Sequence, residues 1–374
     1  MRIAHRPEQA PDAAQAGLVR ARGVVGKPRA GEEPVEASGH VGGRDGIPCG
    51  PANLPRVFPN RDRILVTTVR QLAAERGVEV AAFSGDWILR LSRGGRTEHV
   101  VGYVFPLNSA GARSVADDKA ATAELLADRG VPCVEHRLFL RPDLAGFVRD
   151  GGNWAAMQAM AERCDWDLVV KPNDGTGGLG VVRARGPQAL EEAVHNGFAA
   201  HRALALSPYR EIEAEHRAVV LDGAVLLAYA KARPSVVGDG TRTVAALAAD
   251  AGLGTGALSR SALTDVPASG ERRRLDWRHN LGLGATPRPI ESSEVRAEVE
   301  RLAVRAAETL GLRFASVDVV ETADGRAVLE VNAGVMLEAY ARAVPDGPET
   351  ARRVYGAALD ALFGLPAGPS DRHA

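Results

Sequence analysis

The chain has 374 residues, of which 45% are hydrophobic, and a formal net charge of −1. This length allows two or three packed lobes, and the near-neutral charge excludes the strongly basic character of most nucleic-acid-binding proteins. Three widely spaced cysteines, Cys49, Cys133 and Cys164, make neither a disulfide framework nor a zinc motif. No apolar run is long enough for a membrane span or resembles a signal peptide. We therefore expect a cytoplasmic protein with no nucleic-acid and no membrane partner.

The N-terminal part of the chain changes character near residue 58. Residues 1–57 are rich in Ala, Gly, Pro, Arg and Glu and poor in large apolar groups, which predicts a disordered tail or a mis-assigned start codon. Residues 58–116 predict a small α/β lead-in domain. Its segments are a strand or helix at 63–73, a strand at 78–83, and a hairpin formed by 87–91 and 99–105.

Residues 117–205 predict a first α+β lobe. Asp117 or Asp118 is expected to cap a helix that ends before Gly130, because a glycine at this position commonly terminates a helix. The remaining segments of this lobe are a strand at 131–140 and helices at 151–163 and 187–195.

A glycine-rich loop joins two apolar strands in the middle of this lobe. The first strand ends at Lys171 and Pro172. The lysine precedes the glycines and no helix follows them, so the loop is neither a P-loop nor a dinucleotide fingerprint. Its glycines let the backbone approach a ligand and turn amides toward it, which suits a polyphosphate: Gly175, Gly177, Gly178 and Gly180. The alternative is a mobile surface hairpin.

Lysine is rare in this chain. Lys27, Lys119, Lys171 and Lys231 are the only lysines among 46 basic residues. Where arginine is the default cation, a lysine indicates a place that needs a compact point charge. Lys27 lies in the tail, whereas each of the other three lies beside a feature that suggests nucleotide contact. The alternative is coincidence.

Residues 206–366 predict a second α+β lobe, followed by a tail at 367–374. Apolar runs on both sides of the Asp222-Gly223 turn predict a hairpin, and residues 251–275 predict a polar connection. Ser293 is expected to cap a long amphipathic helix. The last segments are a hairpin formed by 314–322 and 326–332 and a helix from about 349 to 363.

This second hairpin carries polar groups in otherwise apolar strands. Asp318 lies in the first strand, and Glu330 and Asn332 lie in the second. Such groups are costly in an apolar strand unless they are paired or bind a ligand. Three hard oxygen donors on one face predict a Mg²⁺ site that bridges to phosphates. The alternative is an outer sheet face exposed to water.

The length of the hairpin loop decides whether these groups share a face. Side chains alternate along a strand, so Asp318 faces Glu330 only across a loop with an odd number of residues. We expect a three-residue loop, 323–325, with Gly325 in the left-handed position. The resulting pairs are Thr322 with Arg326, Asp318 with Glu330, and Ser316 with Asn332.

A glycine-rich hairpin between two lysine-bearing elements, followed by Asp318 and a Glu-x-Asn pair, resembles the ATP-grasp superfamily over about residues 117–364. Residues 236–244 are similar to part of the cyanophycin synthetase grasp domain. Residues 278–285 are similar to the arginine-and-asparagine turn of the ribosomal-protein glutamate ligases. The resemblance implies an α/β (α+β) fold with two lobes that grip ATP, preceded by the lead-in domain.

The resemblance also implies roles for nucleotide-binding residues. Lys119 and Lys171 would contact the phosphates and the adenine edge, and the loop from Gly175 to Gly180 would close over the phosphates. Lys231 would face the nucleotide or the substrate. One glutamate of the 208–215 hinge would bind the ribose hydroxyls, and the candidates are Glu211 and the preferred Glu213.

Further roles concern the reaction. The resemblance implies that Arg278 and Asn280 stabilise the transferring phosphoryl group, that Arg217 and Arg278 bind substrate, and that the predicted metal ligands hold Mg²⁺. His279 is interpreted as structural, and Arg272 to Arg274 as a solvated surface. The segment 333–338 lacks the Pro-Gly pair that usually follows Glu-x-Asn, which alters the wall beside the metal.

The expected activity is an ATP- and Mg²⁺-dependent carboxylate–amine ligation that forms an amide or peptide bond through an acyl phosphate. Mn²⁺ is an alternative metal. The expected partners are an amino acid or short peptide as carboxylate and amine, and a homo-oligomer is compatible with the sequence. The alternatives are an ATP-grasp kinase that phosphorylates a small molecule and a non-catalytic nucleotide-binding module.

Overall fold

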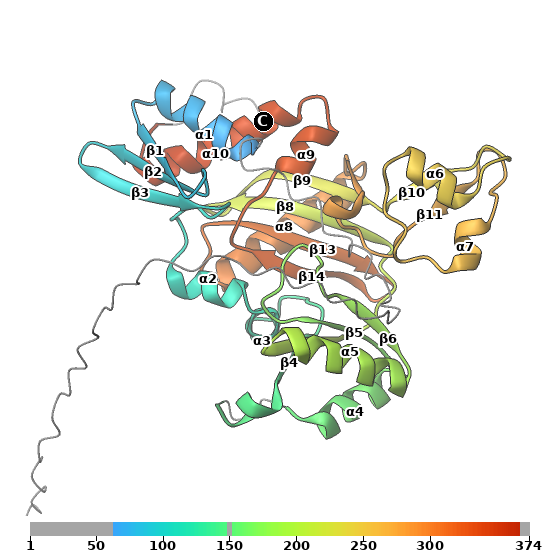
Figure 1. Ribbon diagram of the computed structural model, residues 1–374. Coiled ribbons are helices and arrows are strands. Elements are labelled where there is room, and N and C mark those ends of the chain that lie inside the picture. Colours follow the sequence, from blue (N-terminus) through green and yellow to red (C-terminus); the bar gives the residue numbers. More distant parts are fainter. Residues whose placement is uncertain (1–62, 148–151, 367–374) are drawn as a thin grey trace, which may run out of the picture. The chain divides into compact units, whose positions relative to one another are not determined.

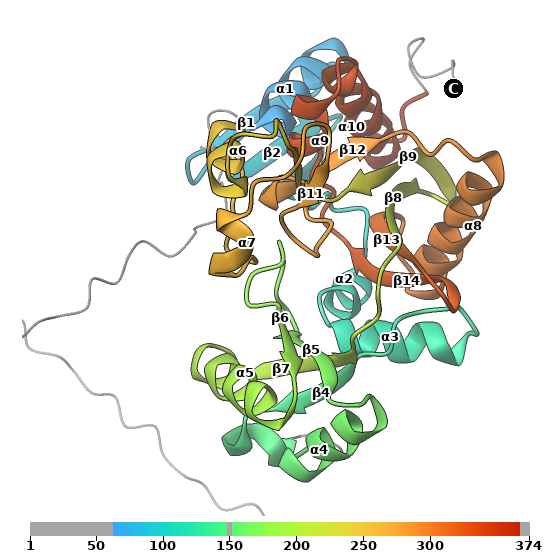
Figure 2. The same cartoon turned by 90° about the vertical axis from the view of Figure 1, so that its right-hand side faces the viewer.

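The structure is a computed structural model that describes residues 63–147 and 152–366. Within these residues the strands form four sheets, and helices pack against them (Figures 1 and 2), so the predicted mixed α/β class is confirmed. The tails predicted at 1–57 and 367–374 lie outside the described residues, and the domain boundaries stay predictions. Among the described helices, none combines the length and the hydropathy needed to cross a membrane.

The first sheet belongs to the lead-in region and has the order β1-β2-β3. The ambiguous segment near residue 63 is a helix, because Leu65, Val69 and Leu72 repeat at helical spacing and are all buried. This helix lies beside the C-terminal helix α10, as Figure 1 shows. The elements are α1 (Ile64–Glu75), β1 (Glu79–Phe83), β2 (Ile88–Arg93), β3 (Arg96–Val101) and α10 (Gly347–Phe363).

The largest sheet has five strands in the order β12-β9-β8-β13-β14. One face, which includes Val317 and Val319, packs on α8. The other face is apolar at one end, where Val219 and Phe314 share a core with the lead-in region, and polar at the other end. The elements are β8 (Ala214–Leu221), β9 (Ala224–Ala232), β12 (Thr286–Arg288), α8 (Ser293–Thr309), β13 (Phe314–Thr322) and β14 (Gly325–Asn332).

A four-stranded sheet in the order β4-β7-β5-β6 carries the glycine-rich loop between β5 and β6. Its central strand β7 was not predicted, although Leu204, Ala205 and Leu206 are buried there. Helices α4 and α5 cover this sheet with Met160 and Leu190. The elements are β4 (Arg137–Leu140), α4 (Trp154–Arg163), β5 (Asp167–Pro172), β6 (Val182–Arg185), α5 (Pro187–Ala200) and β7 (Ala203–Pro208).

Residues 251–275 are not the polar connection that was predicted. They contain α7 and β11, and they belong to a small unit with its own core of Val236, Val244, Leu247 and Leu275. Its elements are β10 (Ser235–Val237), α6 (Val244–Asp250), α7 (Arg260–Thr264) and β11 (Arg272–Arg274). The remaining elements are α2 (Ala110–Ala116), α3 (Lys119–Asp128), α9 (Glu338–Ala343) and the short 3-10 turns Pro142–Phe147 and Leu281–Leu283.

Two predicted helix caps can be checked directly. Asp118, not Asp117, caps α3, because its side chain accepts a hydrogen bond from the backbone N–H of Ala121 at 2.8 Å. The cap of α8 is Ser292, one residue before the predicted Ser293, and it accepts from the N–H of Val295. Both predicted helices are therefore confirmed, with a shift of one residue at α8.

The predicted loop between β13 and β14 is wrong, and so is the predicted pair of Thr322 with Arg326, because Arg326 lies opposite Glu321; the other two predicted pairs are right. Thr322 pairs with Gly325, which leaves a two-residue turn. A β-bulge at Asp318/Val319 then restores the parity, because one extra residue on β14 returns its side chains to the original face. Asp318 therefore lies opposite Glu330, and Ser316 lies opposite Asn332.

Candidate ATP and metal site

A row of charged side chains crosses the polar end of the five-stranded sheet. Asp318 on β13 lies opposite Glu330 on β14 and opposite Arg217 on β8, while Glu215 on β8 lies opposite Lys231 on β9. These residues share one face because side chains alternate along each strand. The sheet register thus brings together residues from four strands that are far apart in the sequence.

Asp318 is the most enclosed member of this row, with 3% of its surface exposed. Arg217 donates two hydrogen bonds to its carboxylate, each of 2.7 Å, and the Lys231 Nζ lies 2.8 Å from its Oδ1. Burial opposes the charge of Asp318, but the two cations outweigh burial and hold its pKa below the ordinary value. Asp318 is therefore ionised and fixed in position.

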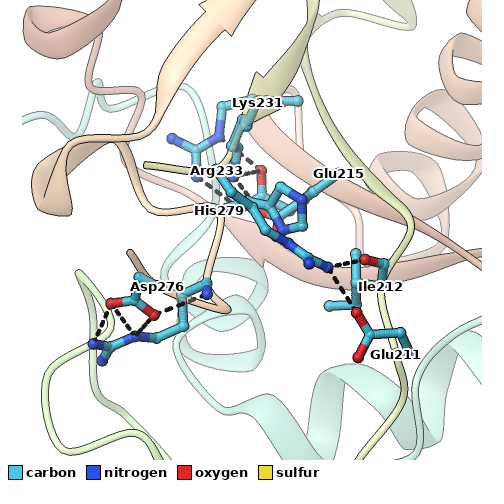
Figure 3. Close-up of polar contacts among 10 residues, drawn as sticks. Glu211, Ile212, Glu215, Lys231, Arg233, Asp276 and His279 are labelled. Atoms are coloured by element: carbon cyan, nitrogen blue, oxygen red, sulfur yellow. Dashed lines mark hydrogen bonds and ion pairs between the residues drawn. The ribbon is translucent and has the colours of Figure 1, made fainter. Parts of the chain in front are cut away.

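Lys231 is shared between two carboxylates, as the close-up in Figure 3 shows for Glu215. Its Nζ donates to Glu215 Oε1 at 2.5 Å. Burial raises the pKa of Glu215, and Lys231 acts in the opposite direction. Burial also disfavours the charge of Lys231, but Asp318 and Glu215 raise its pKa overall. Lys231, predicted as a nucleotide ligand, thus has its charge balanced by protein carboxylates.

The side-chain oxygen atoms of Glu330 and Asn332 have fewer protein partners than those of Asp318. The Glu330 Oε1 lies 3.3 Å from the Lys119 Nζ, and its side chain is 28% exposed. Within the described residues, the Asn332 side chain forms no hydrogen bond with another protein group. The same residues contain no group of three or more His, Cys, Asp or Glu side chains that could hold a metal ion by themselves. Two carboxylates and an amide fit Mg²⁺ only as a partial ligand set that phosphate oxygens and water would complete.

Two residues of the glycine-rich loop accept hydrogen bonds from side chains of other segments. The Lys119 Nζ donates to the carbonyl of Gly175, and the Asn280 Nδ2 donates to the carbonyl of Gly177 at 2.7 Å. Gly178 has φ +71°, and a Cβ atom there would lie 2.7 Å from the Asn280 Nδ2. The loop can adopt this contact because glycine tolerates left-handed backbone angles and close approach. The structure thus brings Lys119, Asn280 and the loop together.

Lys171 lies at the base of the same loop and is 9% exposed. Its Nζ lies 2.7 Å from the Nε2 atom of His136. Burial lowers the pKa of Lys171 to about 8, with a further contribution from the charge of Lys119, although Glu330 and Glu215 oppose the shift. Lys171 therefore remains largely protonated at neutral pH.

Arg278 is held by a neighbour that the sequence did not single out. Asp276 accepts from the Arg278 backbone N–H at 2.9 Å and from its guanidinium at 2.8 to 3.3 Å (Figure 3). Asn280 caps the following turn by accepting from the Gly282 N–H at 2.8 Å. Asp276 thus fixes the orientation of the arginine that was predicted to bind the transferring phosphoryl group.

His279 points into the same region and is 5% exposed. Burial and, to a lesser extent, the nearby cations Arg233 and Lys231 lower its pKa to about 3. A Glu215 carboxylate oxygen lies 3.5 Å from the Nδ1 atom of His279 and does not reverse this shift. His279 is therefore a neutral ring at physiological pH.

The two hinge glutamates have different surroundings. Glu211 accepts a hydrogen bond from the Tyr209 hydroxyl at 2.6 Å and lies 3.3 Å from Arg233, which also donates to the Ile212 carbonyl (Figure 3). Among the described residues, no hydrogen bond engages the exposed Glu213 side chain, which lines a cavity. Glu213 is thus the more available of the two carboxylates.

A cavity of about 600 Å³ opens beside this hinge. Glu213 and Glu215 are its acidic members, and five cations outnumber them. The cations are Lys231, Arg233, Arg272, Arg274 and Arg288. Two of the three arginines that were interpreted as solvated surface therefore line the cavity, whereas Arg273 pairs with Asp265 and Glu271.

Glu215, His136 and Asp276 are the candidate functional residues that the sequence did not indicate. A signal was present for Glu215, because it alternates with Arg217 on a strand whose Ala218 and Val220 point to the other face. His136 and Asp276 lie in loops. The partner of His136 is Lys171, on a distant strand, and the partner of Asp276 is Arg278, in the same turn. No sequence spacing indicates such contacts.

Comparison with known proteins identifies relatives of this chain. Residues 264–346 match the family described as the RimK-like ATP-grasp domain. Cyanophycin synthetase from Nostoc sp. is 26% identical over 319 residues, which are 78% of this chain and 34% of that protein. A probable alpha-L-glutamate ligase from Serratia proteamaculans is 30% identical over 237 residues, which are 63% of this chain and 61% of the ligase. The chain thus spans about a third and about three-fifths of these curated relatives.

A solved structure is also similar. The bifunctional glutathione synthetase from Pasteurella multocida aligns with 79% of this chain and 44% of its own, at 18% identity and a TM-score of 0.49. The predicted resemblance to the ATP-grasp superfamily is confirmed by the family match and by the two kinds of curated relative.

Proposed function

We propose that this chain is an ADP-forming ligase of the ATP-grasp type that joins a carboxylate to an amine. The observation that carries the proposal is the charged face of the five-stranded sheet. There, Asp318 and Glu330 pair with cations, Asn332 lies on the same face, and Lys119, the partner of Glu330, also donates to the glycine-rich loop. Oxygen donors, cations and loop amides in one place are what phosphoryl transfer requires.

The chemistry follows from the poor reactivity of carboxylates. Attack of a carboxylate oxygen on the γ-phosphorus of ATP forms an acyl phosphate and releases ADP, and an amine then displaces phosphate to form the amide. Lys119 and Lys171 would hold the phosphates, and Arg278, oriented by Asp276, would neutralise the transferring group. The loop fastened by Asn280 would exclude water from the acyl phosphate.

The metal would bind beside Glu330 and Asn332, with Asp318 as a third oxygen donor. Mg²⁺ in this place would neutralise charge on the β- and γ-phosphates, and Mn²⁺ has similar preferences. Asp318 already accepts three hydrogen bonds or ion pairs from Arg217 and Lys231, so we assign it the weakest share of the coordination. Glu213 would accept from the ribose hydroxyls because its carboxylate is exposed at the cavity.

The cationic cavity is our candidate for the carboxylate substrate. Arg274 and Arg288 line it and are exposed, and no described residue forms an ion pair with either. Unpaired arginines attract carboxylates and can bind them through two parallel hydrogen bonds. An amino acid or a short peptide would fit a space of about 600 Å³. The free thiols of Cys133 and Cys164 suit a reducing cytoplasm.

The test is ADP release from the purified chain with ATP and Mg²⁺, against pools of amino acids and short peptides. We expect release that requires both an acid and an amine and that is lost in Glu330→Gln. The double variant Arg274→Gln/Arg288→Gln should raise the KM for the carboxylate while leaving the Kd for ATP unchanged. ADP release that accompanies a stable phosphorylated product would instead identify a kinase, and ATP binding without turnover would support a non-catalytic module.

A further inference from the structure

The contact between the buried side chains of His136 and Lys171 has no part in the roles assigned so far. His136 is 5% exposed, precedes β4 and comes from a loop, whereas Lys171 is near the end of β5. Their side chains meet at 2.7 Å between Nε2 and Nζ. A second contact fixes the ring, since its Nδ1 lies 2.9 Å from the carbonyl oxygen of Val134.

These two contacts determine the tautomer of His136. A carbonyl oxygen can only accept, so Nδ1 carries the hydrogen and donates it to Val134. In a neutral ring, Nε2 is then left with a lone pair, which accepts from the Lys171 ammonium. A doubly protonated ring would place an N–H donor and a positive charge against an ammonium group. Burial and the neighbouring Lys171 both lower the pKa of His136, in agreement with a neutral ring.

A neutral acceptor has a specific effect on Lys171. A lysine side chain is a flexible four-carbon stem, so its ammonium is mobile unless a partner fixes it. A carboxylate in the place of His136 would fix the ammonium but would cancel its charge, as Glu215 does for Lys231. The imidazole fixes one N–H and leaves the positive charge and two N–H donors for another ligand.

We propose that His136 is a positioning residue that orients the Lys171 ammonium for the phosphates of ATP. The other charged groups that act on Lys171 are Lys119 from α3, Glu330 from β14 and Glu215 from β8. None of them is within hydrogen-bond distance of its Nζ in the described part of the chain. His136 is therefore the group that sets the direction of this ammonium. The proposal rests on the nucleotide-binding role given to Lys171 above.

The test is a double-mutant cycle on ATP affinity, measured by calorimetry in the presence of Mg²⁺. The variants are His136→Leu, Lys171→Met and the combination of the two. We expect each single variant to raise the Kd for ATP about tenfold or more, because each removes a hydrogen bond of a charged group. If His136 acts through Lys171, the double variant binds no more weakly than Lys171→Met.

Two further variants separate positioning from general damage. His136→Gln can place an amide oxygen near the former Nε2 position, so we expect it to restore most of the affinity that His136→Leu loses. His195→Leu is the matched control, because His195 is exposed on α5 and its loss should change neither the Kd nor the melting temperature. Melting temperatures of all variants show whether the fold is retained.

The outcomes are distinguishable. If His136→Leu raised the Kd for ATP by the same factor in the wild-type chain and in Lys171→Met, the positioning role would be overturned, because the effects of the two substitutions would then be independent. Unchanged affinity in His136→Leu, beside weak binding by Lys171→Met, would also overturn it while leaving the nucleotide site in place. Unchanged affinity in Lys171→Met would refute the role of Lys171 itself, and with it the inference.

Discussion

Asp318 and Glu330 face each other but differ in how much of the fold depends on them. Asp318 is 3% exposed and balances two cations, the buried Lys231 and the half-buried Arg217. Glu330 is partly exposed and meets one lysine at 3.3 Å. A buried charge left without its partner is expensive, whereas a partly solvated pair contributes little. The two candidate metal ligands should therefore respond differently to removal of their charge.

We predict that Asp318→Asn lowers the free energy of unfolding by about 3–5 kcal/mol, because the buried Lys231 and the half-buried Arg217 are then left with one carboxylate, Glu215, between them. Glu330→Gln should cost less than about 1 kcal/mol. Both variants should lose ADP-forming activity. Urea unfolding followed by circular dichroism measures the difference, and equal destabilisation by the two variants would contradict the assigned surroundings.

His279 gives a prediction about acid stability. Its folded pKa of about 3 lies below the ordinary value of 6.5, so the unfolded chain binds a proton that the folded chain does not. The stabilisation is fully present above pH 6.5 and is lost progressively as pH falls toward 3, at up to about 1.4 kcal/mol per pH unit. His279→Gln should therefore show a shallower loss of unfolding free energy between these values. Parallel pH curves for the two proteins would refute the shift.

At the scale of single elements, the contacts of the glycine-rich loop can be tested by substitution of its glycines. Its contact with the 278–284 turn depends on Asn280 and on close approach at Gly178. Gly177 has a similar left-handed backbone, φ +68°, but nothing lies within 4 Å of its Cβ position. Alanine at either position would strain the backbone, but only alanine at Gly178 would also clash with a neighbouring side chain.

We predict that Gly178→Ala reduces kcat/KM for ATP more than Gly177→Ala, because only the former pushes against the Asn280 side chain. The difference should vanish when each glycine substitution is combined separately with Asn280→Ala, since the contacting amide is then absent. Asn280→Ala alone should increase ATP hydrolysis in the absence of amine, because the loop no longer shields the acyl phosphate. Steady-state assays of ADP release provide all three comparisons.

The sequence predicted most elements but not the reasons for their registers. Asp318 was placed opposite Glu330 by counting a three-residue loop, whereas the structure reaches the same pair with a shorter turn and a β-bulge. Strand β7 was missed because its short apolar run follows a helix without a turn signal. The segment 251–275 was predicted as a polar connection because it has few large apolar residues. Most of the core on which it packs comes from Val236, Val244 and Leu247, which precede the segment, and only Leu275 lies within it.

The site was predictable where it depended on strand alternation and not where it depended on contact between segments. Alternation placed Glu330 and Asn332 on one face, whereas Asp318 lies opposite Glu330 through a β-bulge that the sequence did not indicate. The bidentate pair between Arg217 and Asp318 requires β8 to lie beside β13, although the two residues are 101 positions apart. Sequence spacing carries no information about such pairing, so the predicted ligand Asp318 was not expected to be an ion-pair centre as well.

At the scale of the molecule, the lead-in region is part of the same core as the large sheet. Its Leu89 and Leu91 belong to one buried cluster with Val219 and Phe314 of β8 and β13. Buried polar contacts join the same parts. Glu338 is 0% exposed and accepts from the Leu65 N–H at 3.3 Å, while Arg76, directly after α1, pairs with Asp360 on α10 at 2.5 Å.

We predict that a chain shortened to begin at residue 109 does not fold. Removal of the lead-in region would expose Val219, Leu221 and Phe314 together with the apolar side of α10, and such a surface favours aggregation. Soluble yield and the thermal melt measured by circular dichroism report the result. A shortened chain that melts cooperatively near the temperature of the full chain would contradict a shared core.

The central claim is that the charged sheet face and its loop activate a carboxylate as an acyl phosphate. The most direct test uses hydroxylamine as a surrogate amine, with ATP, Mg²⁺ and pools of carboxylate-bearing amino acids and short peptides. We expect ATP-dependent formation of a hydroxamate that is absent in Glu330→Gln. Steady ADP formation with a stable phosphorylated product and no hydroxamate would contradict the claim.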